Sequence, residues 1–347
     1  MWKLGPLVIR QRVLLGGLLP AVVESWFPSS NDSYGLLLED DVEVSPMFYA
    51  WVKMCLLKYR SAWNEQPSIQ AHMVGLRYGS QARYSEKLFG ISLYQQKTIE
   101  LRPQGREPFH AAFLFETAGR PHPHTPFLSQ IPCSWGGLYF PQHWRAFHAY
   151  LIDRLAERTH AIETPIIAPS SRIRSNRWTR SWKKFFNEFV FLHGLVMLYP
   201  NFANWTALST NHLEVGVHVR RPEIEAEFEK KKSQFHLPLM ALPPHPLVQR
   251  TLKRGMQESE IEERWGAGSV LDLPFEALPR WDVLPVVDLW GQLASEKEIA
   301  HRGIERYREL VTNCSDNIGR MPLCKVSDDE NGDDEATDSE RDVVPIH

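Results

Sequence analysis

Residues 34–49 constrain the fold most, because they place three consecutive carboxylates between an apolar stretch and a helical pattern. Residues 34–38 are apolar and follow a polar turn at 28–33, which predicts a buried strand. Ser45 is a favourable N-cap and Pro46 fits the first helical position, so a helix is expected to begin there. Apolar residues that include Trp51 and Cys55 recur at helical spacing behind it and predict its buried face. The acids therefore follow the carboxyl end of a buried strand, where open α/β sheets bind their ligands.

The three acids, Glu39, Asp40 and Asp41, need compensation beside an apolar strand, because burying a charge without a partner is unfavourable. A divalent cation is the obvious partner, and an all-oxygen ligand set suits Mg²⁺ or Mn²⁺ rather than zinc. The alternative is a solvated turn ahead of the helix, whose dipole favours negative charge there. The spacing alone leaves both interpretations open.

The run from Leu38 to Tyr49 resembles the metal-binding segment of GT-A glycosyltransferases. It is similar to the form in Golgi N-acetylglucosaminyltransferases and in a group of fungal and plant family-2-like glycosyltransferases. The resemblance implies an α/β fold with a Rossmann-like mixed sheet of the GT-A type. It also implies that Asp41 binds Mn²⁺ (or Mg²⁺) held by the donor pyrophosphate, while Glu39 and Asp40 face the ribose and donor sugar.

The function implied by the resemblance is metal-dependent transfer of a sugar from a nucleotide-diphosphate donor to a glycan or lipid acceptor. In GT-A enzymes several βαβ units that bind the nucleotide base precede the metal triplet, whereas this triplet begins at residue 39. We therefore expect an incomplete nucleotide-binding half and a chain truncated at its N-terminus. The alternative is a catalytically inactive remnant that acts as a glycan-binding or interaction module.

The same position has consequences for the organisation of the chain. The strand at 34–38 is expected to have an open apolar edge, which favours association. Residues 1–312 are expected to form one domain, and the acidic residues 313–347 a disordered tail. No membrane span is expected within the sequence, so a membrane partner enters only through an N-terminal anchor missing from this chain.

A second informative stretch contains Trp135, Gly136 and Gly137. The two glycines let the backbone approach another group closely, and the tryptophan adds an aromatic face on which a sugar can stack. The resemblance implies that this region lines the pocket for the donor sugar and the acceptor. A glycine turn packed against core aromatic residues is the alternative.

Two further residues are candidates for chemistry. An inverting transferase needs a carboxylate that takes the proton of the acceptor hydroxyl, and Glu188, within a helical pattern at 181–198, is the candidate base. Many GT-A enzymes use a late histidine as another metal ligand, which His212 and His218 both fit. We take His212 as the candidate, and a structural role is the alternative for each histidine.

The remaining patterns predict the other elements. Strands are expected at 72–76, 88–94 and 196–200, and helices at 141–158 and 294–311. Residues 95–125 and 201–213 are expected to be mostly loops.

Composition and short motifs limit the binding partners and the cellular compartment that can be expected for this chain. The net charge of −3 speaks against nucleic acid as a partner, although residues 171–184 interleave basic and aromatic side chains. A solvated face is the default interpretation of that run. The sequons at Asn31, Asn204 and Asn313 favour the secretory pathway, with the Golgi lumen implied by the resemblance.

Overall fold

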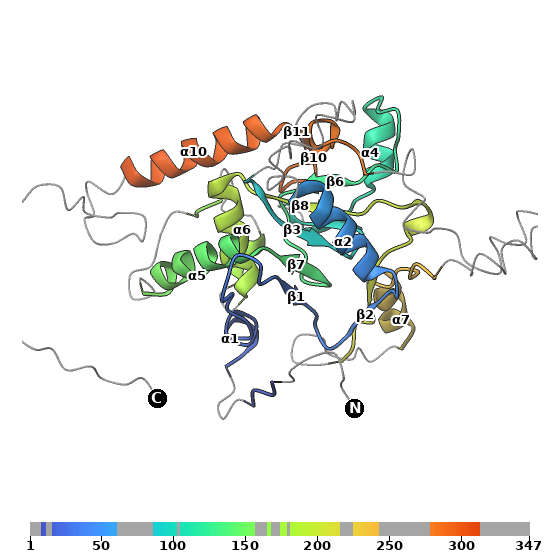
Figure 1. The fold of residues 1–347 in the computed structure, drawn as a ribbon, viewed down its shortest axis with the longest axis horizontal. Helices are drawn as coiled ribbons and strands as arrows, with labels where there is room; N and C mark the ends of the chain where they lie inside the picture. Colours follow the sequence, from blue (N-terminus) through green and yellow to red (C-terminus); the bar gives the residue numbers. More distant parts are fainter. Residues whose placement is uncertain are drawn as a thin grey trace, which may run out of the picture.

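The computed structural model describes residues 8–11, 16–60, 86–102, 105–156, 165–167, 174–178, 181–215, 225–242 and 278–312. A mixed sheet of seven strands forms its centre, in the order β1-β7-β3-β8-β6-β10-β11 (Figure 1). In chain order the strands are β1 (Gly35–Leu37), β3 (Leu88–Ser92), β6 (Phe127–Ser129), β7 (Gly137–Tyr139), β8 (Val196–Tyr199), β10 (Val286–Val287) and β11 (Leu293–Ala294).

The strand directions make the sheet mixed. β3 runs parallel to β8, and β6 runs parallel to β10, whereas every other neighbouring pair is antiparallel. Within the described part of the chain, β1 pairs only with β7 and so forms one edge of the sheet. The predicted α/β class with a mixed sheet is confirmed. A strand is present within 34–38, but it is an edge strand whose residues are half-buried rather than buried, and Leu38 beyond it is exposed.

Side chains alternate between two apolar layers along the central strands, as a pleated strand buried on both faces requires. On β8, Met197 and Tyr199 belong to one core cluster, whereas Val196 and Leu198 belong to the other. All four side chains are buried, so the sheet is covered on both faces.

Helices provide the two covers. On one face lie α1 (Leu18–Val23), α5 (Pro141–Ala156) and α6 (Trp182–His193), and on the other lies α2 (Phe48–Tyr59) (Figure 1). The long helix α10 (Glu296–Thr312) packs against α6. A Cβ atom at Gly303 would lie 2.4 Å from the carbonyl oxygen of Phe191, so this glycine allows the two helices to approach closely.

Two small antiparallel pairs flank the main sheet. β2 (Val42–Val44) pairs with β9 (Ser209–Asn211), and β4 (Thr98–Arg102) pairs with β5 (Gly105–Pro108). The other described elements are α4 (Ala111–Thr117), η3 (Arg174–Arg177), η4 (Ala203–Trp205), α7 (Glu225–Ser233) and η6 (Trp281–Val283).

The structure corrects the sequence prediction at several places. Helix α2 begins at Phe48 rather than at Pro46, because the Ser45 hydroxyl reaches Met240 and residues 45–47 form a turn. Its predicted apolar face is confirmed, with Trp51 and Cys55 fully buried. The loops expected at 95–125 and 201–213 contain β4, β5, α4 and β9, and strands β2, β6, β7, β10 and β11 were not predicted.

The predicted strand at 72–76 and the predicted tail at 313–347 lie outside the described residues. The helices and strands expected at 88–94, 141–158, 181–198, 196–200 and 294–311 are present as β3, α5, α6, β8 and α10, with ends that differ by a few residues. Among the described helices, none combines the length and the apolar character that crossing a bilayer requires.

Candidate functional site

The three acids form a short turn between β1 and β2, which we call the acidic turn. β1 ends at Leu37, and the backbone N–H of Val42 donates to the carbonyl oxygen of Glu39 at 3.2 Å, which closes the turn. Asp40 is exposed at its tip, whereas Glu39 and Asp41 are half-buried on either side. The turn thus presents one exposed and two half-buried carboxylates at the edge of the sheet.

Strand β9 brings a second segment to the acidic turn. Val42 is the register partner of Asn211, and the backbone N–H of His212 donates to the carbonyl oxygen of Asp41 at 2.9 Å. The side-chain amide of Asn211 also donates to a carboxylate oxygen of Asp41 at 2.8 Å. The structure therefore brings together Asp41 and His212, which the sequence proposed as metal ligands, and adds Asn211 between them.

The imidazole of His212 contacts a different acid. Its Nε2 lies 2.8 Å from a carboxylate oxygen of Glu43 on β2, and its ring lies 5.6 Å from the ring of His236. Over the described ranges, no group of three or more His, Cys, Asp or Glu side chains converges in a way that would hold a metal ion. The carboxylate oxygens of the acidic turn are nonetheless the donor type that Mn²⁺ and Mg²⁺ prefer.

Burial and mutual repulsion alter the acidity of the turn. Burial raises the pKa of Glu39 to about 7, and the neighbouring charges of Asp41 and Asp40 add to this shift. The positive charge of Lys183 and a hydrogen bond with Ser134 act in the opposite direction. At neutral pH, Glu39 is therefore divided between its protonated and ionised forms.

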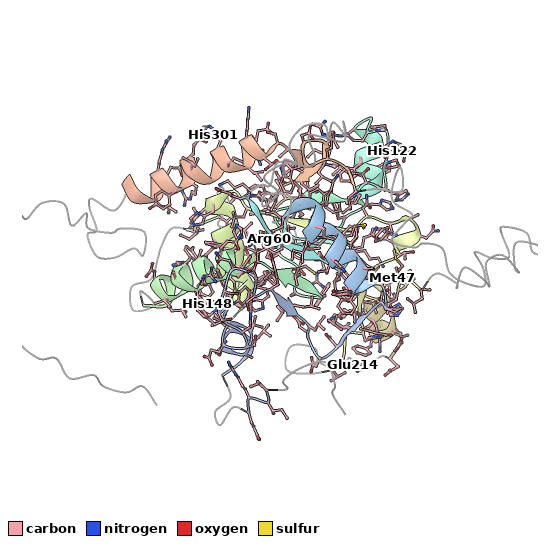
Figure 2. All side chains as sticks on the ribbon, in the orientation of Figure 1. Met47, Arg60, His122, His148, Glu214 and His301 are labelled. Carbon is pink, nitrogen blue, oxygen red and sulfur yellow. The ribbon has the colours of Figure 1, made fainter. Side chains whose placement is uncertain are left out.

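Burial and hydrogen bonding also have opposite effects on the pKa of Asp41. Burial raises the pKa of Asp41, and the hydrogen bonds from the backbone of Glu214 and from the Asn211 side chain limit that rise. Glu214 is labelled in Figure 2, in the segment that follows β9. Two protein donors thus hold the Asp41 carboxylate in one position.

Trp135, Gly136 and Gly137 lie in the turn that enters β7. The Trp135 ring meets Tyr94 and Phe235 edge-on, with centroids 5.0 and 5.3 Å apart. A Cβ at Gly136 would lie 2.8 Å from the Ser209 hydroxyl, and one at Gly137 would lie 2.5 Å from a backbone carbonyl. The glycines therefore allow close approach of the protein's own atoms, and Ser134 is the residue of this turn that contacts the acids.

Glu188 belongs to a separate set of contacts. It is 1% exposed, and both of its carboxylate oxygens accept hydrogen bonds from Arg154 on α5, at 2.9 and 3.2 Å. The Tyr150 hydroxyl donates to the same carboxylate at 3.0 Å. This buried ion pair ties α5 to α6, and both oxygens of the Glu188 carboxylate are engaged in it.

Lys183 lies close enough to the acidic turn for its charge to act on Glu39, which the sequence did not indicate. Its Nζ lies 3.0 Å from Glu100, whose other oxygen pairs with Arg106 at 2.7 Å. Burial opposes ionisation of Glu100, but the charges of Lys183 and Arg106 outweigh it and lower the pKa of Glu100 to about 2. The sequence predicts that residues 171–184 form a solvated face. The sequence feature that could have drawn attention to Lys183 is its position in the first turn of an apolar helix.

Part of the chain matches a known protein-family model. A protein-family model described as the SPBC1E8.03c C-terminal domain matches residues 1–80. The matched range contains the acidic turn and α2, whereas Ser134, Lys183, Asn211 and His212 lie beyond it. No curated protein matches the chain.

Proposed function

We propose that this chain is a metal-dependent glycosyltransferase of the GT-A type, which transfers a sugar from a nucleotide-diphosphate donor to a glycan or lipid acceptor. The observation that carries the proposal is the contact of Asp41 with Asn211 and His212 at the edge of a mixed α/β sheet. Ligand sites in such sheets lie at strand ends, where turns of polar residues meet.

The residues at and near the acidic turn would have different roles. Asp41 and its neighbours Glu39 and Asp40 would supply hard oxygen ligands to Mn²⁺ or Mg²⁺. Asn211 and the backbone of Glu214 would keep the Asp41 carboxylate oriented. When bound, the cation would act as a Lewis acid that stabilises the leaving pyrophosphate.

The position of Lys183 supports the same proposal, whereas His212 would need to change its partner. Lys183 would balance part of the negative charge at Glu39 while it remains paired with Glu100. His212 would have to leave Glu43 to add its imidazole to the ligand set. Glu188 is not part of the proposal, because its carboxylate is occupied by Arg154 and Tyr150.

The test is turnover of a panel of sugar nucleotides with MnCl₂, comparing the natural protein with Asp41→Asn. We expect activity that depends on the cation and falls by about a hundredfold or more in the variant, because Asn cannot supply an anionic ligand. Asp282→Asn, at an exposed acid on η6, is the matched control and should keep full activity. Equal nonzero rates in the natural protein and in Asp41→Asn would remove Asp41 from the mechanism.

A second candidate is a catalytically inactive protein that binds glycans or a partner. It is favoured by the absence, among the described residues, of three converging metal-ligand side chains. Calorimetry with UDP or GDP plus MnCl₂ separates the two candidates. Micromolar binding without turnover of any sugar nucleotide would favour the binding protein over the enzyme.

We place the protein in the secretory pathway, with the Golgi lumen as its compartment. Asn31, the first residue of a sequon, is exposed. Treatment of the protein from its own cells with an N-glycosidase should reduce its mass. An unchanged mass, together with a cytosolic distribution on fractionation, would contradict this placement.

A further inference from the structure

Two adjoining clefts lie between α4, the β4–β5 hairpin and the end of α7. Their volumes are about 790 and 510 Å³, and both are lined by His110, Phe113 and Trp205. We refer to them together as the double cleft. Figure 2 labels His122 just after α4 and Glu214 near the acidic turn, and the two residues lie well apart. The α4 side of the double cleft is therefore distinct from the acidic turn.

The larger cleft has a positively charged wall. Lys97, Arg102 and Arg106 line it, and none of the described residues that line it is an acid. Arg102 pairs with Glu107, while Arg106 shares Glu100 with Lys183. The three cations that line the larger cleft thus have two nearby carboxylates, one of which is shared with Lys183, and a further acid, Glu116, lines the smaller cleft. Within the larger cleft this leaves a surplus of positive charge.

Lys97 accounts for part of this surplus. Among the described residues its Nζ contacts a backbone carbonyl, that of Ser233 at 3.4 Å, and lies 5.7 Å from the Trp205 ring centroid. Partial burial lowers the pKa of Lys97, because the ammonium has lost water without gaining a carboxylate. An anionic group bound beside Lys97 would replace the water that the ammonium has lost.

Trp205 provides an aromatic wall at the junction of the two clefts. It has a φ of 59° and follows Asn204 with a φ of 54°, so two consecutive residues other than glycine adopt the left-handed conformation. Such conformations are unfavourable and occur preferentially where they position a functional side chain. Here the tight turn at η4 holds the indole half-buried against His110, with ring centroids 4.8 Å apart.

The smaller cleft contains a buried acceptor without a donor. Gln95 is 5% exposed, and its Nε2 donates to Asn201 Oδ1 and to the carbonyl of Phe202 at 3.4 and 3.2 Å. The amide of Asn201 is oriented by its donation to the carbonyls of Pro123 and Thr125, which fixes the orientation of Gln95. Gln95 Oε1 is left without a partner in the described structure, and so is Nδ1 of His124 beside it.

We propose that the double cleft binds an anionic sugar, either a sugar phosphate or a uronic acid. A pyranose ring would stack on Trp205, and its anionic group would pair with Lys97 and Arg106. A neutral sugar would leave Lys97 without an anionic partner, and a bare anion would leave the indole unused. The proposal does not depend on sugar transfer at the acidic turn.

The test is isothermal titration of the full chain at low salt with glucose 6-phosphate, glucuronic acid, glucose and inorganic phosphate. All solutions contain EDTA and no nucleotide, so the result is independent of metal binding at the acidic turn. We expect at least one of the two anionic sugars to bind at least about tenfold more tightly than glucose and than phosphate. The tighter of the two identifies the anionic group as a phosphate or a carboxylate.

Variants assign the binding to the double cleft. We expect weaker binding of the anionic sugar in Lys97→Gln, by about tenfold. We also expect weaker binding in Trp205→Phe and in Trp205→Leu. Lys58→Gln, at an exposed lysine on α2, is the matched control and should bind as the natural protein does. The proposal is overturned if Lys97→Gln binds with unchanged affinity, if phosphate binds as tightly as the sugars, or if neither anionic sugar binds at about 10 mM.

Discussion

The side-chain amide of Asn211 donates a hydrogen bond of 2.8 Å to the carboxylate of Asp41, across 170 residues of sequence. The oxygen of the same amide accepts from the backbone N–H of Leu213, also at 2.8 Å. Asn211 is 1% exposed, so both bonds are shielded from water. This side chain therefore connects the acidic turn to the segment that carries His212.

Replacement of Asn211 by alanine should destabilise the fold and loosen the acidic turn. Both hydrogen bonds are lost and a half-buried carboxylate oxygen loses its donor, so we expect a loss of about 1–3 kcal/mol in the free energy of unfolding. Urea denaturation measures the change, with Lys58→Ala, at an exposed lysine on α2, as the control. A loss no larger than that of the control would show that Asn211 does not hold the turn.

The pH dependence of stability should change in Glu39→Gln. The pKa of Glu39 rises from 4.5 to about 7 on folding, so the folded protein binds this proton more tightly than the unfolded chain does. Ionisation of Glu39 therefore costs stability as the pH rises from about 4.5 to about 7, and the full penalty persists above that range.

Glutamine cannot ionise, so Glu39→Gln should have a higher melting temperature than the natural protein at pH 8 and a smaller advantage at pH 5. The measurement is thermal unfolding at both pH values. Glu227→Gln, at an exposed acid on α7, is the control and should show no such difference between the two pH values. A Glu39→Gln variant that gains nothing at pH 8 would contradict the assigned burial of Glu39.

The ion pair between Glu188 and Arg154 should behave as a structural unit. Glu188→Ala leaves a buried guanidinium without its carboxylate, and we expect a loss of about 3–5 kcal/mol in unfolding free energy. The double variant Glu188→Leu with Arg154→Met removes both charges and should recover much of the loss. A double-mutant cycle by chemical denaturation measures the coupling, and additive effects would argue against the pair.

Alanine variants at Gly136 and Gly119 distinguish the stability cost of backbone strain from the cost of steric overlap. Both have positive φ, 94° and 69°, but a Cβ at Gly136 would lie 2.8 Å from the Ser209 hydroxyl, whereas one at Gly119 has no atom within 4 Å. Gly119→Ala should cost about 1 kcal/mol for its conformation alone, and Gly136→Ala clearly more. Equal losses in urea denaturation would show that the turn at Gly136 relaxes without strain.

Local patterns in the sequence predicted the parts of the fold that depend on nearby residues. The apolar run at 34–38 became β1, and the helical spacing of Trp51 and Cys55 marked the buried face of α2. β2 and β9 were not predicted, because each has three residues and their pairing depends on contacts across the whole chain. Two-residue alternation over such short segments does not distinguish a strand from a loop.

The site was predicted only in part, because the sequence shows neighbouring residues but not the contacts between distant elements. The acids at Glu39, Asp40 and Asp41 are contiguous in the sequence, so their common position was evident. Glu188 was chosen because it is an acid on an apolar helix, and its partner Arg154 becomes visible only when α5 packs against α6. The role of Lys183 likewise depends on Glu100, a residue on another element.

The most direct test of the account is Mn²⁺ binding followed by electron paramagnetic resonance, in which the signal of free Mn²⁺ falls as the ion is bound. The natural protein, Asp41→Asn and the control Asp282→Asn are titrated with MnCl₂ in the presence of UDP or GDP. We expect one nucleotide-dependent Mn²⁺ site in the natural protein and in the control, weakened by at least about tenfold in Asp41→Asn. Mn²⁺ binding of equal affinity in Asp41→Asn, or its absence from the natural protein with either nucleotide, would contradict the proposed metal site at the acidic turn.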